Sequence, residues 1–397
     1  MNKFSKPNIQ LKRKADKYIG YFLFFLIVPL VRLLGILLKR NHQLNNPPKT
    51  ILFIKLLGLG SLVISIPAIQ EIRKKYPEAK LILLTDSNIR DGIAPFDLFD
   101  EFWPIKTSFI FITVIDSLRF IIKSWQIRKL WVVDLEVYSK LTTVYSLFTF
   151  AINRFGFLLS PVLFRKYLNT HNVLFNQSAF LGDNYLYMAE IITDGFIRLD
   201  SGKQNKRLHE YTKPFIALNN TCSELATVRK LPDGTFIFIC EWIIQNTSYN
   251  IALLGSIVDR YSNNVLIDSN TILSVHKNRI LNYAGSVIFE DYYNFLSEQC
   301  VCLITIDSGP LHIAKALGLP TLSIWGPTNP ANYLKIQADE QIRHQYHYLK
   351  VQCSPCVHFH EKLPCGGNNF CMKNIEAEAI ISKIETLLNH LKYDDSN

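Results

Sequence analysis

The sequence predicts an α/β protein in which two successive halves each alternate buried strands with helices. In the first half a helix is expected over residues 62–75, and the buried strands are expected at residues 51–55, 80–85 and 130–135. A second alternation occupies residues 214–325, and the polar, lysine-rich segment 200–213 separates the two. A chain of 397 residues is long enough for two cores, because single cores seldom exceed about 250 to 300 residues.

The amino-terminal region predicts a membrane-associated helix. Residues 1–17 are rich in lysine and arginine, and residues 19–38 are apolar except for Arg32. Pro29 and the central arginine, which costs about 2.5 to 3.5 kcal/mol at mid-bilayer, favour a helix lying in the interface, with a single span as the alternative. The absence of a small-residue cleavage site after the apolar run argues against a secretory signal peptide.

The most informative stretch predicts a strand, a tight turn, a helix and a second strand. The strands are expected at residues 302–306 and 321–325, Pro310 suits the first helical position, and Gly318 is placed to end the helix. The helix then opens at Ser308 and Gly309. Because its first backbone N–H groups are unpaired and carry partial positive charge, we expect a phosphorylated ligand to bind there.

Two polar side chains accompany this turn. Asp307 follows the strand at the edge where open α/β sheets bind ligands, and His312 lies about one turn into the helix. Both could face a ligand. Spacing alone equally allows Asp307 to cap the helix and His312 to fill its flank.

The same stretch carries a motif of ten matching positions: Asp307, Ser308, Gly309, His312, Ala314, Ala316, Pro320, Gly326, Pro327 and Thr328. It resembles the donor-site signature of glycosyltransferase family nine, the ADP-heptose:lipopolysaccharide heptosyltransferases. The resemblance extends from about residue 50 to about residue 375. It includes a Gly-rich turn after the first strand, at residues 51–69, and Arg154-Phe-Gly156.

The resemblance implies a GT-B fold with two facing Rossmann-like domains. Together with the composition of the chain, it gives four segments, namely 1–48 (basic terminus, membrane-associated helix and linker), 49–206 (acceptor domain), 207–374 (donor domain with a cysteine cluster) and 375–397 (closing helix and tail). The expected donor-binding residues are Gly58, Gly60, Ser61, Arg229, Asp259, Asp307, Ser308, Gly309 and His312. The implied activity is inverting, metal-independent transfer of a sugar, such as heptose from ADP-heptose, to a lipid-linked saccharide such as lipopolysaccharide core.

Two residues are expected to carry the catalysis. Arg229 stands where the family places a phosphate-contacting cation, although the residue could also be a solvated loop charge. Ser61 stands where the family has the aspartate proposed as base, and a neutral hydroxyl cannot replace a carboxylate. Glu136, after the strand at 130–135, is the substitute candidate, with a purely structural role as the alternative. Otherwise the donor or acceptor differs from the typical case, or the chain binds its ligand without catalysis.

A cysteine cluster follows the donor motif, at Cys353, Cys356, Cys365 and Cys371. Its Cys-x-x-Cys start suits a structural tetrahedral zinc site, and disulfides are the alternative. No cofactor is expected for catalysis itself.

The net charge of +10 indicates an anionic partner. No nucleic-acid module is legible, so nucleotide phosphates, lipopolysaccharide or phospholipid are the expected partners. Because nucleotide sugars are cytosolic, we expect monotopic attachment at the cytoplasmic face of the inner membrane. The alternative functions are a glycosyltransferase of another surface glycan that uses a different nucleotide sugar, and a non-catalytic nucleotide-sugar or glycolipid binding protein.

Overall fold

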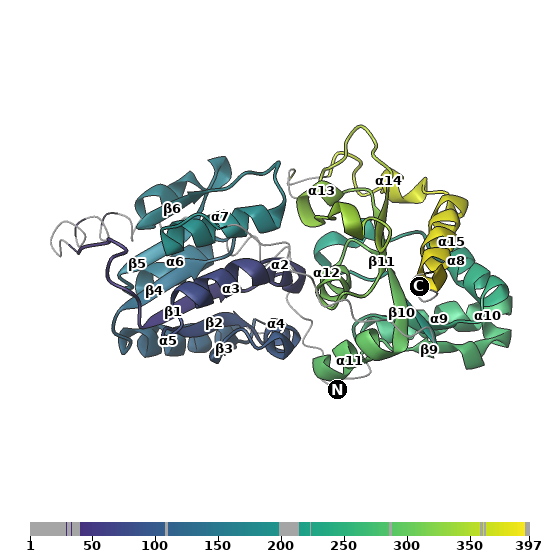
Figure 1. The fold of residues 1–397 in the computed structure, drawn as a ribbon, viewed down its shortest axis with the longest axis horizontal. Helices are drawn as coiled ribbons and strands as arrows, with labels where there is room; N and C mark the ends of the chain where they lie inside the picture. Colours follow the sequence, from purple (N-terminus) through teal and green to yellow (C-terminus); the bar gives the residue numbers. More distant parts are fainter. Residues whose placement is uncertain are drawn as a thin grey trace. The chain divides into compact units, whose positions relative to one another are not determined.

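The protein divides into two compact units, Met1–Asp200 and Ser201–Asn397. The computed structural model describes residues 40–107, 110–197, 214–222, 224–285, 288–357, 360 and 363–393, together with Pro29 and Leu33. In Figure 1 the amino-terminal unit runs from purple to teal and the carboxyl-terminal unit from green to yellow. Each unit is an α/β structure built around a parallel sheet.

The amino-terminal unit contains a six-stranded parallel sheet with the order β3-β2-β1-β4-β5-β6. Its strands are β1 (Thr50–Lys55), β2 (Lys80–Asp86), β3 (Glu101–Ile105), β4 (Leu130–Asp134), β5 (Asn153–Leu158) and β6 (His171–Leu174). The strand order reverses between β1 and β4. In open α/β sheets, ligands bind at the carboxyl ends of the strands on either side of such a switch point.

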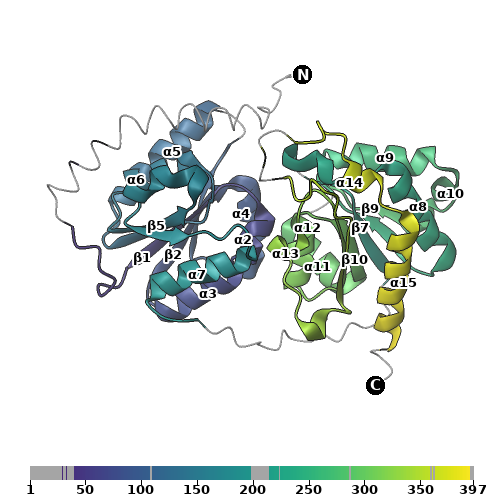
Figure 2. The same ribbon diagram turned by 90° about the horizontal axis from the view of Figure 1, so that it is seen from above.

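Helices cover both faces of this sheet. They are α2 (Leu59–Ile64), α3 (Ile66–Lys75), α4 (Ser87–Ile93), α5 (Ile110–Trp125), α6 (Lys140–Phe148) and α7 (Leu181–Thr193). Figure 2 shows α3 and α7 on one face and α5 and α6 on the other. The core side chains come from strands that are buried over most of their length, such as β1 and β4.

The helix expected over residues 62–75 is two helices. The first, α2, starts earlier than predicted, at Leu59, and α3 follows after a break at Ser65. Pro67 explains the break, because proline lacks the N–H that would continue the hydrogen-bond ladder. The predicted strands at 51–55, 80–85 and 130–135 are confirmed to within one residue at either end.

The carboxyl-terminal unit repeats the same topology, with the order β12-β11-β10-β7-β8-β9. Its strands are β7 (Phe215–Asn219), β8 (Asn250–Leu253), β9 (Ile280–Asn282), β10 (Cys300–Ile306), β11 (Thr321–Trp325) and β12 (His344–Tyr348). Its helices are α8 (Asp233–Asn246), α9 (Asp259–Ser269), α10 (Thr271–Val275), α11 (Phe289–Gln299), α12 (Gly309–Ala316), α13 (Pro330–Tyr333), α14 (Phe370–Lys373) and α15 (Ala377–Tyr393). The switch point of this sheet lies between β7 and β10.

The last helix, α15, packs into the core of the carboxyl-terminal unit. Its buried side chains include Ile384 and Leu388, which join Ile239 and Ile243 of α8 in one hydrophobic cluster. This cluster also contains the apolar side chains of β7 and β10, so it fixes the two strands that flank the switch point.

The predicted membrane segment at residues 19–38 lies outside the described residues, apart from Pro29 and Leu33. Within the described ranges, no helix is both long enough and apolar enough to cross a bilayer. The expectation of an amino-terminal membrane helix therefore stays a prediction.

Candidate functional site

The carboxyl-terminal unit places a helix start at the end of its central strand. All seven residues of β10 are buried, and the strand ends at Ile306. Ser308, two residues later, is the N-cap residue of α12. Pro310 lies in the first turn of α12, and Gly318 adopts a left-handed φ of 72° just after its end. The strand, turn, helix and strand expected over residues 302–325 are confirmed.

Gly309 leaves the space in front of α12 open. A Cβ built at this position would meet no atom within 4 Å, and its φ lies outside the left-handed region. Neither packing nor backbone conformation therefore requires glycine there. A close approach of a ligand to the backbone N–H groups of the helix start does explain it, because a phosphate needs that space.

Asn219, at the end of β7, holds the turn from the neighbouring strand. Its Nδ2 donates to Ser308 Oγ over 2.9 Å and to Thr305 Oγ1 over 3.1 Å. Sequence reasoning missed Asn219. The sequence signal for Asn219 is a polar residue at the end of a short apolar run. Ligand-site residues of parallel sheets lie at such strand ends.

Asp307 and Arg229 lie together beside this turn. The Asp307 carboxylate is buried and accepts a hydrogen bond from Thr328 Oγ1 over 2.7 Å. Its Oδ2 is 3.3 Å from Arg229 Nη1, which also donates to the Asp307 backbone oxygen. The guanidinium is 16% exposed on its side chain, so it is a partly buried group of the site and not a solvated loop charge.

The segment that carries Arg229 is itself anchored. Asn220 accepts a hydrogen bond from the Leu231 N–H over 2.8 Å and donates to the Leu231 carbonyl over 3.1 Å. This reciprocal pair fixes the chain two residues beyond Arg229. Asn219 and Asn220 thus hold the helix start and the cation, respectively, at the switch point of the sheet.

His312 lies on the buried side of α12. Its side chain is 8% exposed, and burial lowers its pKa to about 4, with Asp307 opposing the shift and Arg229 adding to it. The imidazole is therefore neutral near pH 7. A neutral ring can donate one hydrogen bond and accept another, but it cannot supply a positive charge for a phosphate.

The pKa of His312 predicts how stability responds to acid. A histidine of the unfolded chain ionises near 6.5, so between pH 6.5 and about 4 the unfolded state binds more protons than the folded state. The free energy of unfolding should fall as the pH falls through this window, by up to about 3 kcal/mol from this group. Urea unfolding at several pH values should show that the free energy of unfolding depends less steeply on pH in His312→Gln than in wild type. Equal slopes in the two proteins would contradict the assignment.

Asp259 stands at the first position of α9, beyond the end of β8. Its Oδ2 accepts hydrogen bonds from the Ser256 N–H over 2.9 Å and the Ser256 hydroxyl over 2.6 Å. The carboxylate therefore fixes the loop between β8 and α9. Its predicted contact with a nucleotide ribose stays a prediction.

The amino-terminal unit places a second turn at its own switch point. Gly58 adopts a φ of 80° directly before α2, and this left-handed conformation favours glycine. Ser61 donates its hydroxyl to the Gly58 carbonyl over 2.7 Å, while Gly60 is buried inside the turn. In this structure the Ser61 side chain closes the turn.

Glu136 is engaged on both carboxylate oxygens. Its Oε1 accepts hydrogen bonds from the backbone N–H groups of Leu56 and Leu57, over 2.9 and 2.7 Å, and its Oε2 is 3.1 Å from Lys55 Nζ. The residue is 7% exposed. The geometry therefore favours the structural alternative for Glu136, because three of the roughly four acceptor positions of its carboxylate are already used. The Glu136 side chain positions the turn that follows β1.

A second ion pair lies behind this one. Arg165 is fully buried, donates to the backbone oxygens of Glu136 and Ser139, and lies 3.4 Å from Asp134 Oδ2. Burial raises the pKa of Asp134 to about 6, although Arg165 opposes the shift. Sequence reasoning missed Arg165 and Lys55, since charged residues are rarely fully buried unless paired.

The four clustered cysteines line one small pocket. Cys353, Cys356, Cys365 and Cys371 surround it, and all four are free thiols. Burial, helped by the neighbouring thiols, raises the pKa of Cys371 to about 11. No group of three or more histidine, cysteine, aspartate or glutamate side chains in the described residues has the arrangement of a metal site. The structural zinc therefore stays a prediction.

Metal analysis of the purified full-length chain tests this prediction. A tetrahedral site made of these thiols should hold about one zinc ion per chain. The Cys356→Ser protein should lose it, whereas Cys222→Ser, outside the pocket, should keep it. A metal-free wild-type chain, or cross-linked cysteines by mass spectrometry, would contradict the zinc site.

Comparisons with known proteins agree with this geometry. The family model of glycosyltransferase family 9 (heptosyltransferase) matches residues 170–365. Lipooligosaccharide heptosyltransferase 2 of Campylobacter jejuni is 30% identical over 88 residues, which are 22% of this chain and 26% of that protein. The chain thus aligns with about a quarter of the length of that curated relative.

Two solved structures share the fold. A glycosyltransferase family 9 protein from Veillonella parvula has a TM-score of 0.64 at 18% identity, covering 86% of this chain and 97% of that chain. The ADP-heptose lipopolysaccharide heptosyltransferase II of E. coli has a TM-score of 0.63 at 15% identity, covering 86% of this chain and 99% of that chain. Residues 170–365 of this chain therefore form a glycosyltransferase family 9 domain, as the motifs predicted.

Proposed function

We propose that this protein transfers a sugar, specifically heptose from ADP-heptose, to a lipid-linked saccharide such as lipopolysaccharide core. The names of the relatives support this choice, because they are heptosyltransferases of lipooligosaccharide and lipopolysaccharide. The transfer inverts the anomeric carbon and needs no metal. It takes place at the cytoplasmic face of the inner membrane, where residues 19–38 attach the chain as a monotopic segment.

The helix start at Gly309 is the observation that carries the proposal. It presents the Gly309 N–H at the switch point of the sheet, where a Cβ at Gly309 would meet no atom within 4 Å, with Arg229 beside it. The charge that grows on the departing diphosphate needs such fixed donors. Because Asp307 balances the charge of Arg229, the helix start supplies most of the net attraction, and the guanidinium supplies directed hydrogen bonds.

The reaction itself exchanges two bonds at the anomeric carbon. The acceptor hydroxyl attacks this carbon, the bond to the diphosphate oxygen breaks, and the nucleoside diphosphate leaves with the electron pair. The hydroxyl proton must pass to a base. Ser61 cannot serve as that base, and Glu136 already accepts three contacts, so its part is to hold the turn on which the acceptor would lie.

The engaged state of Glu136 supports a second candidate function. Without a carboxylate ready to accept a proton at the turn, the protein would bind a nucleotide sugar or glycolipid and not transfer the sugar. Both candidates use the same donor site. They differ only in whether a product forms.

A transfer assay separates the two. Purified full-length protein is incubated with ADP-heptose and heptose-free lipopolysaccharide, and mass spectrometry follows the acceptor. Transfer predicts a mass increase of one heptose together with release of ADP in equal amount. Binding of ADP-heptose with neither product would establish the binding protein. If transfer occurs only with a different nucleotide sugar, the assigned donor is wrong.

A further inference from the structure

The outward face of α5 exposes an apolar stripe. Its members recur every three or four residues and therefore lie on one side of the helix. They are Phe111 (76% exposed), Val114 (51%), Leu118 (55%), Ile122 (54%) and Trp125 (54%). The opposite side of the helix is in the core, where the Phe120 ring lies 4.9 Å from that of Tyr145. A continuous exposed apolar stripe on a folded domain marks an interaction surface.

The stripe extends along the whole flank of the sheet. Helix α5 connects the end of β3 to the start of β4, and the two strands are parallel, so the helix must run antiparallel to them. Its Phe111 end therefore lies toward the carboxyl edge of the sheet, where the turn at Gly58 and Glu136 is found. Its Trp125 end lies toward the amino edge.

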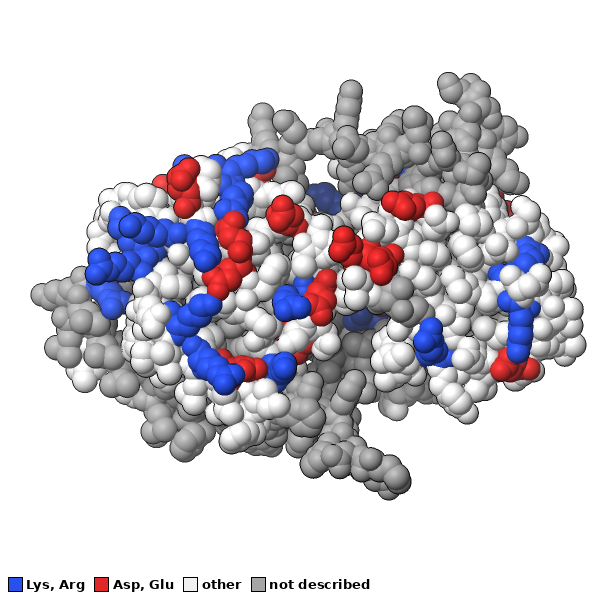
Figure 3. Space-filling model, turned by 90° about the horizontal axis from the view of Figure 1, so that it is seen from below, with Lys and Arg blue, Asp and Glu red and all other residues white. Residues whose placement is uncertain are grey.

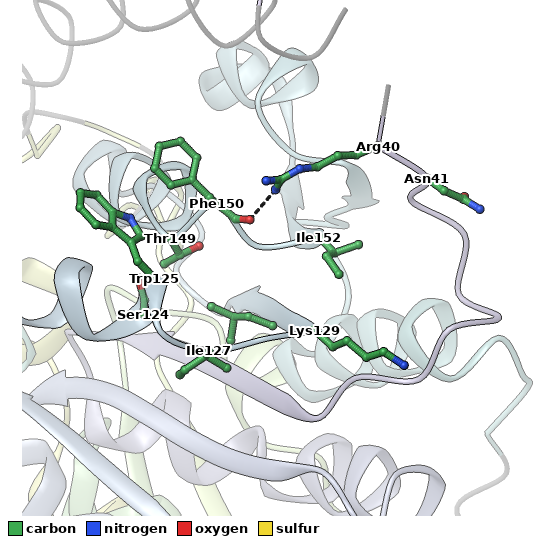
Figure 4. Close-up of a pocket in the computed structure, with 10 residues that line it drawn as sticks. Arg40, Asn41, Ser124, Trp125, Ile127, Lys129, Thr149, Phe150 and Ile152 are labelled. Carbon is green, nitrogen blue, oxygen red and sulfur yellow. Dashed lines mark hydrogen bonds between the residues drawn. The ribbon is translucent and has the colours of Figure 1, made fainter. Parts of the chain in front are cut away.

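Aromatic side chains extend the surface at the amino edge. Phe150 is 49% exposed, and its ring lies 5.8 Å from that of Trp125. Trp125 donates its indole N–H to the Phe148 carbonyl over 2.6 Å, so its polar atom is satisfied while more than half of the residue remains exposed. A hollow of about 470 Å³ lies beside these rings (Figure 4). Tryptophan with a satisfied N–H suits a membrane interface.

Cations border this apolar surface. Arg40 and Lys129 line the hollow, Arg128 is exposed next to it, and Arg119 and Lys123 lie beside the stripe on α5. Arg119 and Lys123 pair with Asp116 and Glu101, whereas no ion pair with a carboxylate is found for Arg128 or Lys129 in the described part of the chain. Figure 3 shows that lysine and arginine are more numerous over the amino-terminal unit than over the other unit on that face. Positive charge beside apolar side chains fits an anionic lipid surface.

The apolar segment at residues 19–38 joins the folded unit at the same place. Arg40, two residues after its end, donates from Nη1 to the Phe150 carbonyl over 2.7 Å. The chain outside the described residues therefore begins at the edge of the aromatic surface. A membrane that holds this segment would lie within reach of Trp125 and Phe150.

We propose that the outer face of α5, together with Phe148, Phe150 and the hollow beside them, docks onto an anionic lipid bilayer. The apolar stripe enters the interface, and the bordering cations contact lipid phosphates. This inference deepens the proposed function, on whose lipid-linked acceptor it rests. Because the stripe ends near the carboxyl edge of the sheet, docking would bring that edge close to the membrane that carries the acceptor.

Quenching by brominated lipids tests the docking in the full-length chain. Trp125 is the tryptophan of the stripe, Trp103, Trp131 and Trp325 are buried, and Trp242 is partly buried in the carboxyl-terminal unit. With vesicles containing phosphatidylglycerol and lipids brominated on the acyl chains, the wild-type fluorescence should be quenched. The Trp125→Phe protein should lose most of that quenching, and so should wild type on purely zwitterionic vesicles. Equal quenching of wild type and Trp125→Phe would overturn the proposal.

A paired substitution measures what the stripe contributes to binding. Leu118→Asp with Ile122→Asp should lower partitioning onto the anionic vesicles at least tenfold. The matched control, Tyr261→Asp with Val265→Asp, alters two exposed apolar residues of α9 and should leave partitioning unchanged. Unchanged partitioning of the α5 protein would overturn the proposal.

Two further outcomes would replace the bilayer with another occupant. If acrylamide fails to quench Trp125 without lipid, the chain itself covers the stripe. If light scattering shows that the α5 substitution splits an oligomer, a second copy covers it. ADP affinity measured on the same proteins keeps the two proposals apart, because the α5 substitution should not alter it. If the wild-type protein does not bind ADP, the result contradicts the proposed function and leaves the docking proposal unaffected.

Discussion

Replacing Arg229 with alanine should lower kcat/KM for sugar transfer about 100- to 1,000-fold. The guanidinium lies beside the start of α12, and its hydrogen bonds would strengthen as charge grows on the leaving diphosphate. Steady-state kinetics with ADP-heptose and a lipid-linked acceptor would measure the effect. Wild-type turnover in Arg229→Ala would remove this residue from the mechanism.

Two controls keep this result interpretable. Lys230→Ala removes the same charge one position away and should change kcat/KM far less. Arg229→Ala also leaves the buried Asp307 carboxylate with the Thr328 hydroxyl as its remaining described side-chain partner, so some stability should be lost. Kinetics should therefore be measured well below the unfolding temperature of the variant. Arg229→Lys should recover stability but not the full rate, because lysine cannot form the paired hydrogen bonds of a guanidinium.

Replacing Glu136 with glutamine should destabilise the amino-terminal unit by about 3 to 5 kcal/mol. The substitution removes the partner of Lys55, whose side chain is only 6% exposed, and weakens the anchor of Leu56 and Leu57. Burial alone would lower the pKa of Lys55, but Glu136, together with Tyr185 and Asp134, raises it above the usual value. In the variant the buried ammonium is left without its carboxylate partner, and burial disfavours its charged form. Urea unfolding followed by circular dichroism would measure the loss.

Glu101→Gln is the matched control in the same unit. Glu101 pairs with Lys80 and Lys123 at the surface, and exposed pairs contribute at most about 1 kcal/mol. Adding Lys55→Met to Glu136→Gln should recover much of the lost stability, since no buried charge then remains unpaired. A Glu136→Gln protein with wild-type stability but no transfer would instead restore Glu136 as the base.

The fold was predictable where one local signal decides it. Strand β11 (Thr321–Trp325) matches the expected residues at both ends, because a short apolar run between a helix-ending glycine and Gly326 has few other interpretations. The break at Ser65 was also legible in principle, since Pro67 follows it by two residues. The helical spacing of apolar residues continues on both sides of Pro67 and so hides the break.

The candidate site was predictable only in part. The motif located Asp307, Gly309 and Arg229, which the structure brings together. The partners of Glu136 were not predictable, because Lys55 lies 81 residues away in the chain and a lysine at a strand end usually indicates a surface. Pairing of distant charges depends on strand order, which no local pattern encodes. The exposure of the apolar stripe on α5 also depends on tertiary packing, so it cannot be predicted from the local sequence.

The placement of the donor diphosphate on the start of α12 is tested most directly by titrating ADP into Gly309→Ala. A Cβ at Gly309 meets nothing within 4 Å in the ligand-free protein, and the same holds at Gly234 in the first turn of α8. Both alanine variants should fold as wild type does. Calorimetry should show ADP affinity at least tenfold weaker for Gly309→Ala and unchanged for Gly234→Ala. Wild-type affinity in Gly309→Ala would mean that the diphosphate does not lie on this helix start.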